Sequence, residues 1–275
     1  MNTEFQPAPL ESSAPLLAPD RAHSRRGPRL IAVARQEDGV RHTAMHAHAR
    51  GQLLGAWQGL LTVHAANQQW VVPPQHAVWI PPGLPHGLRS HGPYAGYGVY
   101  ISPAACAGLP PSACVLQGSA LLLAAVERAA SWQEGAVDPA RRRIVEVIRD
   151  EIRSLPRAGT ALVLPQHARL RQMALAMSNA PADTRNLDEW AASIGMAPRT
   201  LARRFLAETG VTVGAWRQQA RLMRAQEMLA TGAAVTTVAL ELGYDNVSAF
   251  IAMFRRELGA TPGQRRTRPG VPAGA

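Results

Sequence analysis

The sequence predicts an α+β protein with two main domains, an N-terminal β-barrel followed by an all-α domain that carries two helix-turn-helix motifs. Three observations support this prediction. The chain has 275 residues, a length that suits about two domains of ordinary size. Short apolar runs broken by Gly and Pro fill the first half after residue 28, as in barrels and sandwiches. From Pro165 onwards, apolar residues recur at helical spacing instead.

The order of these patterns divides the chain into five segments. The first segment holds five prolines and no sustained apolar periodicity, which predicts a flexible tail. The predicted segments are a tail (1–28), a barrel (29–105), a helical dimerisation and linker region (106–164), an all-α domain (165–268) and a second tail (269–275).

The helical linker region carries an apolar stripe. Pro139 suits the first turn of a helix. The stripe after it consists of Ile144, Val147, Ile148, Ile152 and Leu155. It is larger than a lone surface helix needs, so we predict a homodimer formed through residues 119–155. The alternative is that the stripe packs on the chain's own barrel.

One pattern occurs twice in the C-terminal third: a short apolar helix, a turn with glycine, and a second helix that ends at another glycine. The first copy spans 187–210 and the second spans 235–259. Gly195 and Gly243 occupy the turns, where a positive φ angle is expected. Each copy is therefore predicted to be a helix-turn-helix motif.

The second helix of each copy is predicted to read DNA. Leu201 and Phe205 should pack in the first copy, and Phe250 and Phe254 in the second, which leaves small residues and arginines outside. The candidate DNA-binding residues are Arg199, Thr200, Ala202, Arg203, Arg204, Asn246, Ser248, Ala249, Ala252, Arg255 and Arg256. A helix over 212–229 would span roughly 27 Å between them, comparable to one DNA turn of about 34 Å.

Charge also favours double-stranded DNA as the partner. The chain has 29 basic residues, all arginine, against 19 acidic residues, a formal net charge of +10. From Pro165 to the end, 14 arginines stand against 8 acidic residues, so the excess is densest in the predicted DNA-binding domain.

Residues 166–268 resemble the DNA-binding domain of the AraC/XylS family of transcription regulators. The segment 238–262 carries the signature of the second half, VALELGYDNVSAFIAMFRRELGATP. The resemblance implies a sequence-specific, ligand-responsive regulator that acts with RNA polymerase. Ala197 departs from the family, in which many members have Ser capping the first recognition helix, so one cap hydrogen bond should be missing.

The predicted barrel is rich in histidine, since seven of the nine histidines lie between His42 and His91. His46, His48, Gln52 and His86 resemble the metal motifs of the cupin barrel, in which two closely spaced histidines, a Glu and a later His converge. Alternate strand residues share a face, so these side chains can meet. The resemblance implies a divalent transition metal such as Zn, Fe or Ni. Because Gln52 replaces the Glu, a metal-free effector pocket made of the same four residues is the alternative.

Three functions remain to be compared. The leading one is a transcription regulator that responds to a small-molecule effector. A regulator that senses the metal itself is the second. A cupin metalloenzyme with a helical appendage is disfavoured, because no carboxylate base accompanies the histidines. We therefore expect no enzyme activity, no catalytic residues, no membrane association and, without a readable secretory signal, a cytoplasmic location.

Overall fold

The computed structural model describes residues 13–133, 138–158 and 161–266. The N-terminal half contains α1 (Pro19–His23), β1 (Leu30–Glu37), β2 (His42–His46), β3 (Gly51–Ala65), β4 (Gln68–Val72), β5 (His76–Ile80), β6 (His86–Ile101), the 3-10 helix η1 (Pro103–Ala105) and β7 (Cys114–Gln117). The remainder contains α2 (Ala120–Ala130), α3 (Pro139–Ser154), β8 (Leu162–Val163), α4 (Ala168–Asn179), α5 (Leu187–Ser193), α6 (Pro198–Thr209), α7 (Val213–Ala230), α8 (Val235–Glu241), α9 (Val247–Leu258) and α10 (Pro262–Arg266). Within these ranges, no helix is both long enough and apolar enough to cross a membrane.

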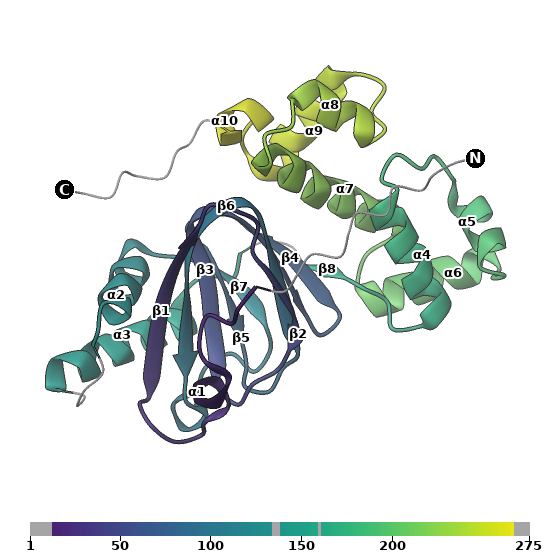
Figure 1. Cartoon of the computed structure of the whole chain (residues 1–275). Helices are drawn as coiled ribbons and strands as arrows, with labels where there is room; N and C mark the ends of the chain where they lie inside the picture. The colour runs from purple at the N-terminus through teal and green to yellow at the C-terminus, as the bar shows by residue number, and fades with distance from the viewer. Residues whose placement is uncertain (1–12, 134–137, 159–160, 267–275) are drawn as a thin grey trace.

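The eight strands form one antiparallel sheet that curls into a barrel (Figure 1). The long strands β3 and β6 pair along most of their length, and irregularities in register between Ala56 and Leu60 break this pairing. Bulges of this kind bend a strand. The N-terminal half of β3 therefore pairs with β5, and its C-terminal half with β4. The barrel predicted from the short apolar runs is confirmed.

Alternation along the strands separates two apolar cores. Leu54 and Val78 belong to one cluster, which also contains Trp70 and Leu88. Their sequence neighbours Leu53 and Trp79 belong to another cluster, which α2 and α3 cover. Both faces of this part of the sheet are thus buried, as the near-continuous apolar runs require.

The stripe of α3 packs within its own chain. Val145, Ile148 and Ile152 are buried in the cluster between α2, α3 and the barrel, and Ile144, Val147 and Leu155 pack against it. Figure 1 shows the two helices beside β1. The structure thus favours the alternative use of this stripe, and the homodimer stays a prediction without that support.

The first segment differs from the predicted tail. Residues 1–12 lie outside the described part, but the chain from Ser13 packs on the barrel. The guanidinium of Arg50, which is 1% exposed, donates to the carbonyl oxygens of Arg21, Arg26 and Pro28 at 2.8–3.1 Å. A buried guanidinium needs such acceptors, so residues 13–28 complete the barrel.

The helical domain contains two cores that share α7. The first includes Trp190, Phe205 and Trp216, and the second includes Phe250 and Phe254. Phe205 and Trp216 meet edge to face with ring centroids 5.8 Å apart. The predicted all-α domain with two helix-turn-helix motifs is confirmed.

The segment predicted as helical linker, 106–164, also supplies strands. β7 pairs with β5, and β8 pairs with β4, so the sheet extends to Val163. Val163 then contacts the helical domain, because its carbonyl oxygen accepts a hydrogen bond of 2.7 Å from Trp216 Nε1. The prediction ended the barrel at residue 105 and did not include these two short strands. The predicted tail 269–275 lies outside the described residues.

Candidate DNA interface and sensor pocket

In the first helix-turn-helix motif, α5 is followed by a tight turn and α6. Asn186 and Glu189 form a reciprocal capping box at the start of α5. Gly195 has a φ of +61°, as predicted for the turn. α6 then begins at Pro198, and Ala197 supplies no side-chain cap, also as predicted. Leu201 and Phe205 are completely buried, which turns the opposite face of α6 outwards.

The second motif repeats this arrangement with α8 and α9. Gly243 has a φ of +75°, and its α-carbon faces the backbone of Ala182 so closely that a side chain would have no room. Asn246 caps α9 by accepting a hydrogen bond of 2.8 Å from the backbone N–H of Ala249. α6 and α9 each have 12 residues and end at a left-handed glycine. The motifs are joined by the 18 residues of α7, about 27 Å of helix.

The candidate DNA-binding residues are accessible on these two helices. Thr200 and Ala202 are partly buried, and the other candidates are exposed: Arg199, Arg203, Arg204, Asn246, Ser248, Ala249, Ala252, Arg255 and Arg256. Arg256 pairs with Glu257 at 2.9 Å. The side chains of Arg199, Arg203, Arg204 and Arg255 have no partner among the residues that the structure describes. Unpaired arginines beside small residues suit a groove of DNA.

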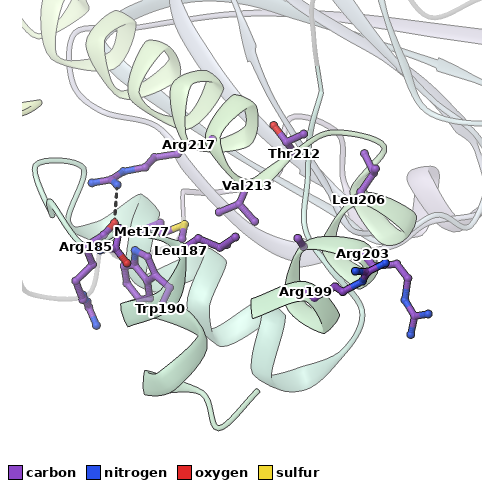
Figure 2. A pocket seen from close by; sticks show the side chains of 13 residues that line it. Met177, Arg185, Leu187, Trp190, Arg199, Arg203, Leu206, Thr212, Val213 and Arg217 are labelled. Carbon is purple, nitrogen blue, oxygen red and sulfur yellow. Dashed lines mark hydrogen bonds between the residues drawn. The ribbon is translucent and has the colours of Figure 1, made fainter. Parts of the chain in front are cut away.

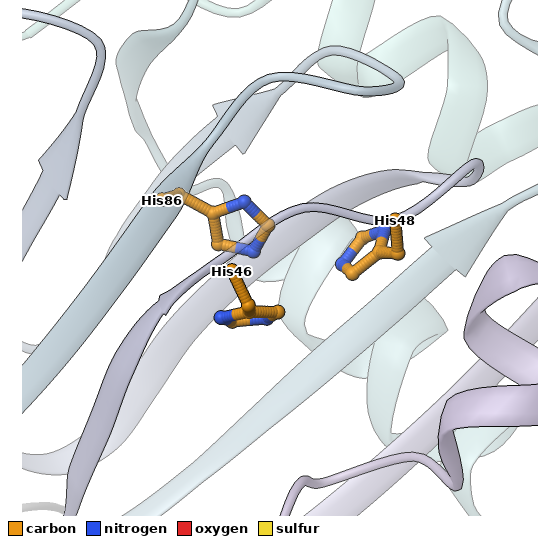
Figure 3. Close-up of side chains that lie close together, drawn as sticks. All are labelled: His46, His48 and His86. Carbon is orange, nitrogen blue, oxygen red and sulfur yellow. The ribbon is translucent and has the colours of Figure 1, made fainter.

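The three histidines of the cluster lie close together (Figure 3). His46 ends β2 opposite His86 of β6, and His48 follows in the loop before β3. Their ring centroids are 4.3–5.6 Å apart. Gln52 of β3 lies among them, with Oε1 3.2 Å from His48 Nε2 and 2.9 Å from His86 Nε2. The structure therefore brings together all four residues that the sequence singled out.

The buried histidines are held as neutral rings. Burial lowers the pKa of His86 to about 3 and lowers that of His48 as well. Nδ1 of each ring lies 2.8 Å from a backbone carbonyl oxygen, to which it donates its single proton. Nε2 of each ring therefore keeps its lone pair towards the centre of the pocket. Rotating the Gln52 amide by a half-turn would place its NH2 group where Oε1 now lies. This group could then donate a hydrogen bond to each of the two Nε2 atoms.

The same arrangement suits a divalent transition metal. Potential ligand atoms of His46, His48 and His86 lie within 4.8 Å of one another. Carbonyl partners on Nδ1 are the usual support of metal-binding histidines. The donor set of three neutral imidazoles and one amide therefore fits Zn, Fe or Ni, although it carries no negative charge.

The pocket that contains this cluster has a volume of about 250 Å³. Its other walls come partly from the N-terminal segment, including Leu16, Leu17 and His23, and from Tyr100 of β6. Residues between 13 and 23 thus form part of the wall of this pocket. The sequence analysis missed these lining residues, because their contacts join segments far apart in the chain.

The barrel and α7 meet in a buried polar junction. Thr62 of β3 donates a hydrogen bond of 2.8 Å to the carboxylate of Glu227, and its hydroxyl lies 2.9 Å from His91 Nε2. The side chain of Glu227 is 13% exposed and also pairs with Arg224 at 3.3 Å. Sequence reasoning did not find this junction. In the sequence, Glu227 is an acidic residue on a helix whose apolar residues pack in two cores, and this pattern does not point to the barrel.

Comparison with known proteins identifies both halves. A model described as AraC-like ligand binding domain matches residues 30–145, and one described as helix-turn-helix domain matches residues 190–268. The HTH-type transcriptional regulator NimR of Escherichia coli (strain K12) is 36% identical over 223 residues, 80% of this chain and 81% of that protein.

Two further matches cover about a third of this chain each. The HTH-type transcriptional regulator RipA of Corynebacterium glutamicum is 36% identical over 99 residues, 36% of this chain and 30% of that protein. The crystal structure of the DNA-binding domain of AdpA in complex with a target DNA is 28% identical, covers 34% of this chain and 86% of that chain, and has a TM-score of 0.33.

Proposed function

Because the chain belongs to the AraC family of transcription regulators, we propose that it reads two adjacent major grooves, one with α6 and one with α9. The observation that carries this proposal is the repeated motif. Two recognition helices of equal length expose arginines and small residues, and α7 joins them. The effector pocket of the barrel then controls how this reader binds its operator.

Each candidate residue has a proposed role. Arg199 and Arg203 contact base edges in the first groove, and Ser248 and Ala252 lie against bases in the second. Arg255 and Arg256 bind phosphates. Thr200, Ala202, Arg204 and Ala249 flank these contacts on the same two helices, and Asn246 flanks them as the N-cap of α9.

The test uses the full chain and an operator selected from a random DNA library. Arg203→Ala should weaken binding to the selected site and relax the preference at one position, since a bidentate arginine–guanine pair is worth roughly 1–3 kcal/mol of discrimination. Arg256→Ala should weaken binding to all DNA sequences alike. It should also reduce the slope of log affinity against log salt concentration by about 0.9. Arg128→Gln, on the exposed face of α2, is the charge-matched control. An unchanged base preference in Arg203→Ala would contradict its role.

We propose further that His46, His48, Gln52 and His86 bind the effector. The converging imidazoles and the pocket volume of about 250 Å³ support a small polar molecule. A metal-sensing regulator is the second candidate, which the cluster of three histidines favours. A bound ion would supply a Lewis-acidic position for an anionic effector.

Metal titration separates these two candidates. The metal content of untagged protein and calorimetric titration with Zn²⁺ or Ni²⁺ should be compared for wild type, His48→Ala and Gln52→Glu. If the site binds metal, Gln52→Glu should bind it more tightly, because a carboxylate adds the missing negative charge, and His48→Ala should lose it. Equal and negligible binding in all three would leave the metal-free effector pocket.

The remaining partners are a second copy of the chain and RNA polymerase. A homodimer would pair two such readers on a longer operator. Sedimentation at micromolar concentration tests the dimer. Addition of polymerase to the protein–operator complex in a mobility-shift assay tests the second contact. The cytoplasm, where operators lie, is the proposed location.

A further inference from the structure

A second cavity lies in the helical domain, away from the barrel. It has a volume of about 680 Å³ and opens between α5, α6 and the first turns of α7 (Figure 2). This volume is within the range of about 300–1,000 Å³ that is typical of small-molecule sites. Neither base reading by α6 nor the histidine cluster accounts for it.

The floor of this cavity is apolar. Leu187 and Trp190 of α5, Val213 of α7 and Met177 of α4 line it. Leu206 of α6 stands at its edge and is 47% exposed, so it adds apolar surface to the rim of the cavity. A flat, apolar molecule would cover this surface.

The walls are cationic. Figure 2 shows Arg185 and Arg217 on one side, and Arg199 and Arg203 on the other. None of the described residues that line the cavity is acidic. Asp183, outside the lining, pairs with Arg185, and the guanidinium of Arg185 lies 3.5 Å from the centre of the Trp190 ring. An occupant with a carboxylate would match this charge.

Two buried donors lack a partner beside the cavity. Trp190 is 3% exposed, and its Nε1–H has no acceptor among the described residues. Arg217 donates through Nη1 to the carbonyl oxygen of Arg185 at 3.1 Å, while its buried Nη2 has no partner in the same described part of the chain. Buried donors are normally satisfied, so two orphans at one cavity indicate a missing acceptor.

We propose that this cavity binds a small organic anion with a flat apolar body, such as an aromatic carboxylate. The carboxylate accepts from Arg217 and the ring lies against Val213 and Leu206. Occupancy also engages Arg199 and Arg203, so the ligand competes with DNA. This last step rests on the proposed DNA contacts of α6, whereas binding of the anion does not.

The test titrates the full chain with 2-naphthoate, and with neutral 2-naphthamide as the uncharged counterpart, by calorimetry. Naphthoate should bind with 1:1 saturation, and the amide should bind at least about 10-fold more weakly. Arg217→Gln should weaken naphthoate binding by about 10-fold or more, since it removes a charged donor. Arg128→Gln on α2 should leave it unchanged.

A filling variant provides an independent check. Gly214 lines the cavity with open space around its α-carbon, and it lies in the first turn of α7, where a residue other than glycine is also compatible with the helix. Gly214→Leu should therefore keep the fold, as measured by thermal unfolding, and lose naphthoate binding. Naphthoate should also raise the apparent dissociation constant for operator DNA in wild type but not in Gly214→Leu.

Three results would overturn the proposal. The first is the absence of saturable naphthoate binding. The second is equal binding in wild type, Arg217→Gln and Gly214→Leu, which would locate the anion in another site. The third is weaker DNA binding by Arg217→Gln without any naphthoate binding, which would identify the cavity as a seat for a DNA phosphate. A failed base-reading role of Arg203 would leave the calorimetric result intact, so the two proposals fail separately.

Discussion

The polar junction between the barrel and α7 makes a quantitative prediction about how the domains are coupled. Thr62→Val keeps the shape of the side chain and removes the hydroxyl that donates to Glu227 at 2.8 Å. The carboxylate then stays buried with fewer donors. A hydrogen bond to a charged group contributes about 1.5–3 kcal/mol, so we expect a loss of that size in the free energy of unfolding. With a urea dependence of roughly 1–3 kcal/mol/M, the midpoint should fall by about 1 M.

A double-mutant cycle isolates this interaction. Glu227→Gln alone and the double variant with Thr62→Val should give a coupling energy of about 0.5–3 kcal/mol. Thr237→Val and Glu241→Gln form the matched control pair, because both residues are exposed on α8 and have no mutual hydrogen bond. That pair should be additive. Unfolding is measured in urea by tryptophan fluorescence and by circular dichroism, so that separate domain transitions become visible.

The same unfolding curves also show whether the junction couples the two domains. If the junction couples the domains, the Thr62→Val chain should unfold in two resolved steps where the wild type unfolds in one. Additive single effects, together with unfolding curves that superimpose on those of the control pair, would refute the reasoning. The barrel and the helical domain would then be held together by β8, by the Asn67–Arg171 contact and by the packing of Val71 against the first helical core.

Three further predictions address the turn, the junction and the dimer. Gly243→Ala should destabilise the fold by about 1–3 kcal/mol and clearly more than Gly259→Ala, because both have positive φ but only the first lacks space for a side chain. Burial lowers the pKa of His91 despite Glu227, so the free energy of unfolding should fall as the pH drops below about 6.5, and His91→Gln should flatten this slope in denaturation measured from pH 7.5 to 5.5. Leu121, 57% exposed on α2, would be buried by a dimer through α2 and α3, so Leu121→Asp should shift sedimentation towards the monomer and leave stability unchanged.

The sequence was most informative where structure depends on local spacing. The glycines at 195 and 243, the paired phenylalanines and the proline at 198 each act within one or two helical turns, so the helix-turn-helix motifs could be predicted with their buried and exposed faces. The four residues of the sensor pocket were also found together. Their roles in binding DNA, effector or metal stay predictions.

Contacts between distant segments could not be predicted in this way. Residues 13–28 differ from the predicted tail, because prolines and polar residues indicate only local preference. Arg41 and Arg50 are both 1% exposed, and their acceptors include backbone carbonyls of residues 14–28. No sequence pattern within the first 28 residues predicts these hydrogen bonds from Arg41 and Arg50. The apolar stripe of α3 could not be assigned for a related reason. An apolar stripe shows that one side of a helix is buried, but not which surface covers it.

The helix α7 illustrates both sides of this limit. Its apolar residues predicted a spacer between two motifs, and the structure places Trp216 in the first core and Leu229 in the second. Its polar residue Glu227 contacts the barrel through Thr62 and His91, which spacing could not reveal. One continuous helix of 18 residues thus belongs to both motifs and to the junction with the sensor domain. A displacement of β3 or β6 that moves α7 must move both recognition helices together, because each packs on it. We therefore propose that an effector in the barrel acts on DNA binding by shifting α7.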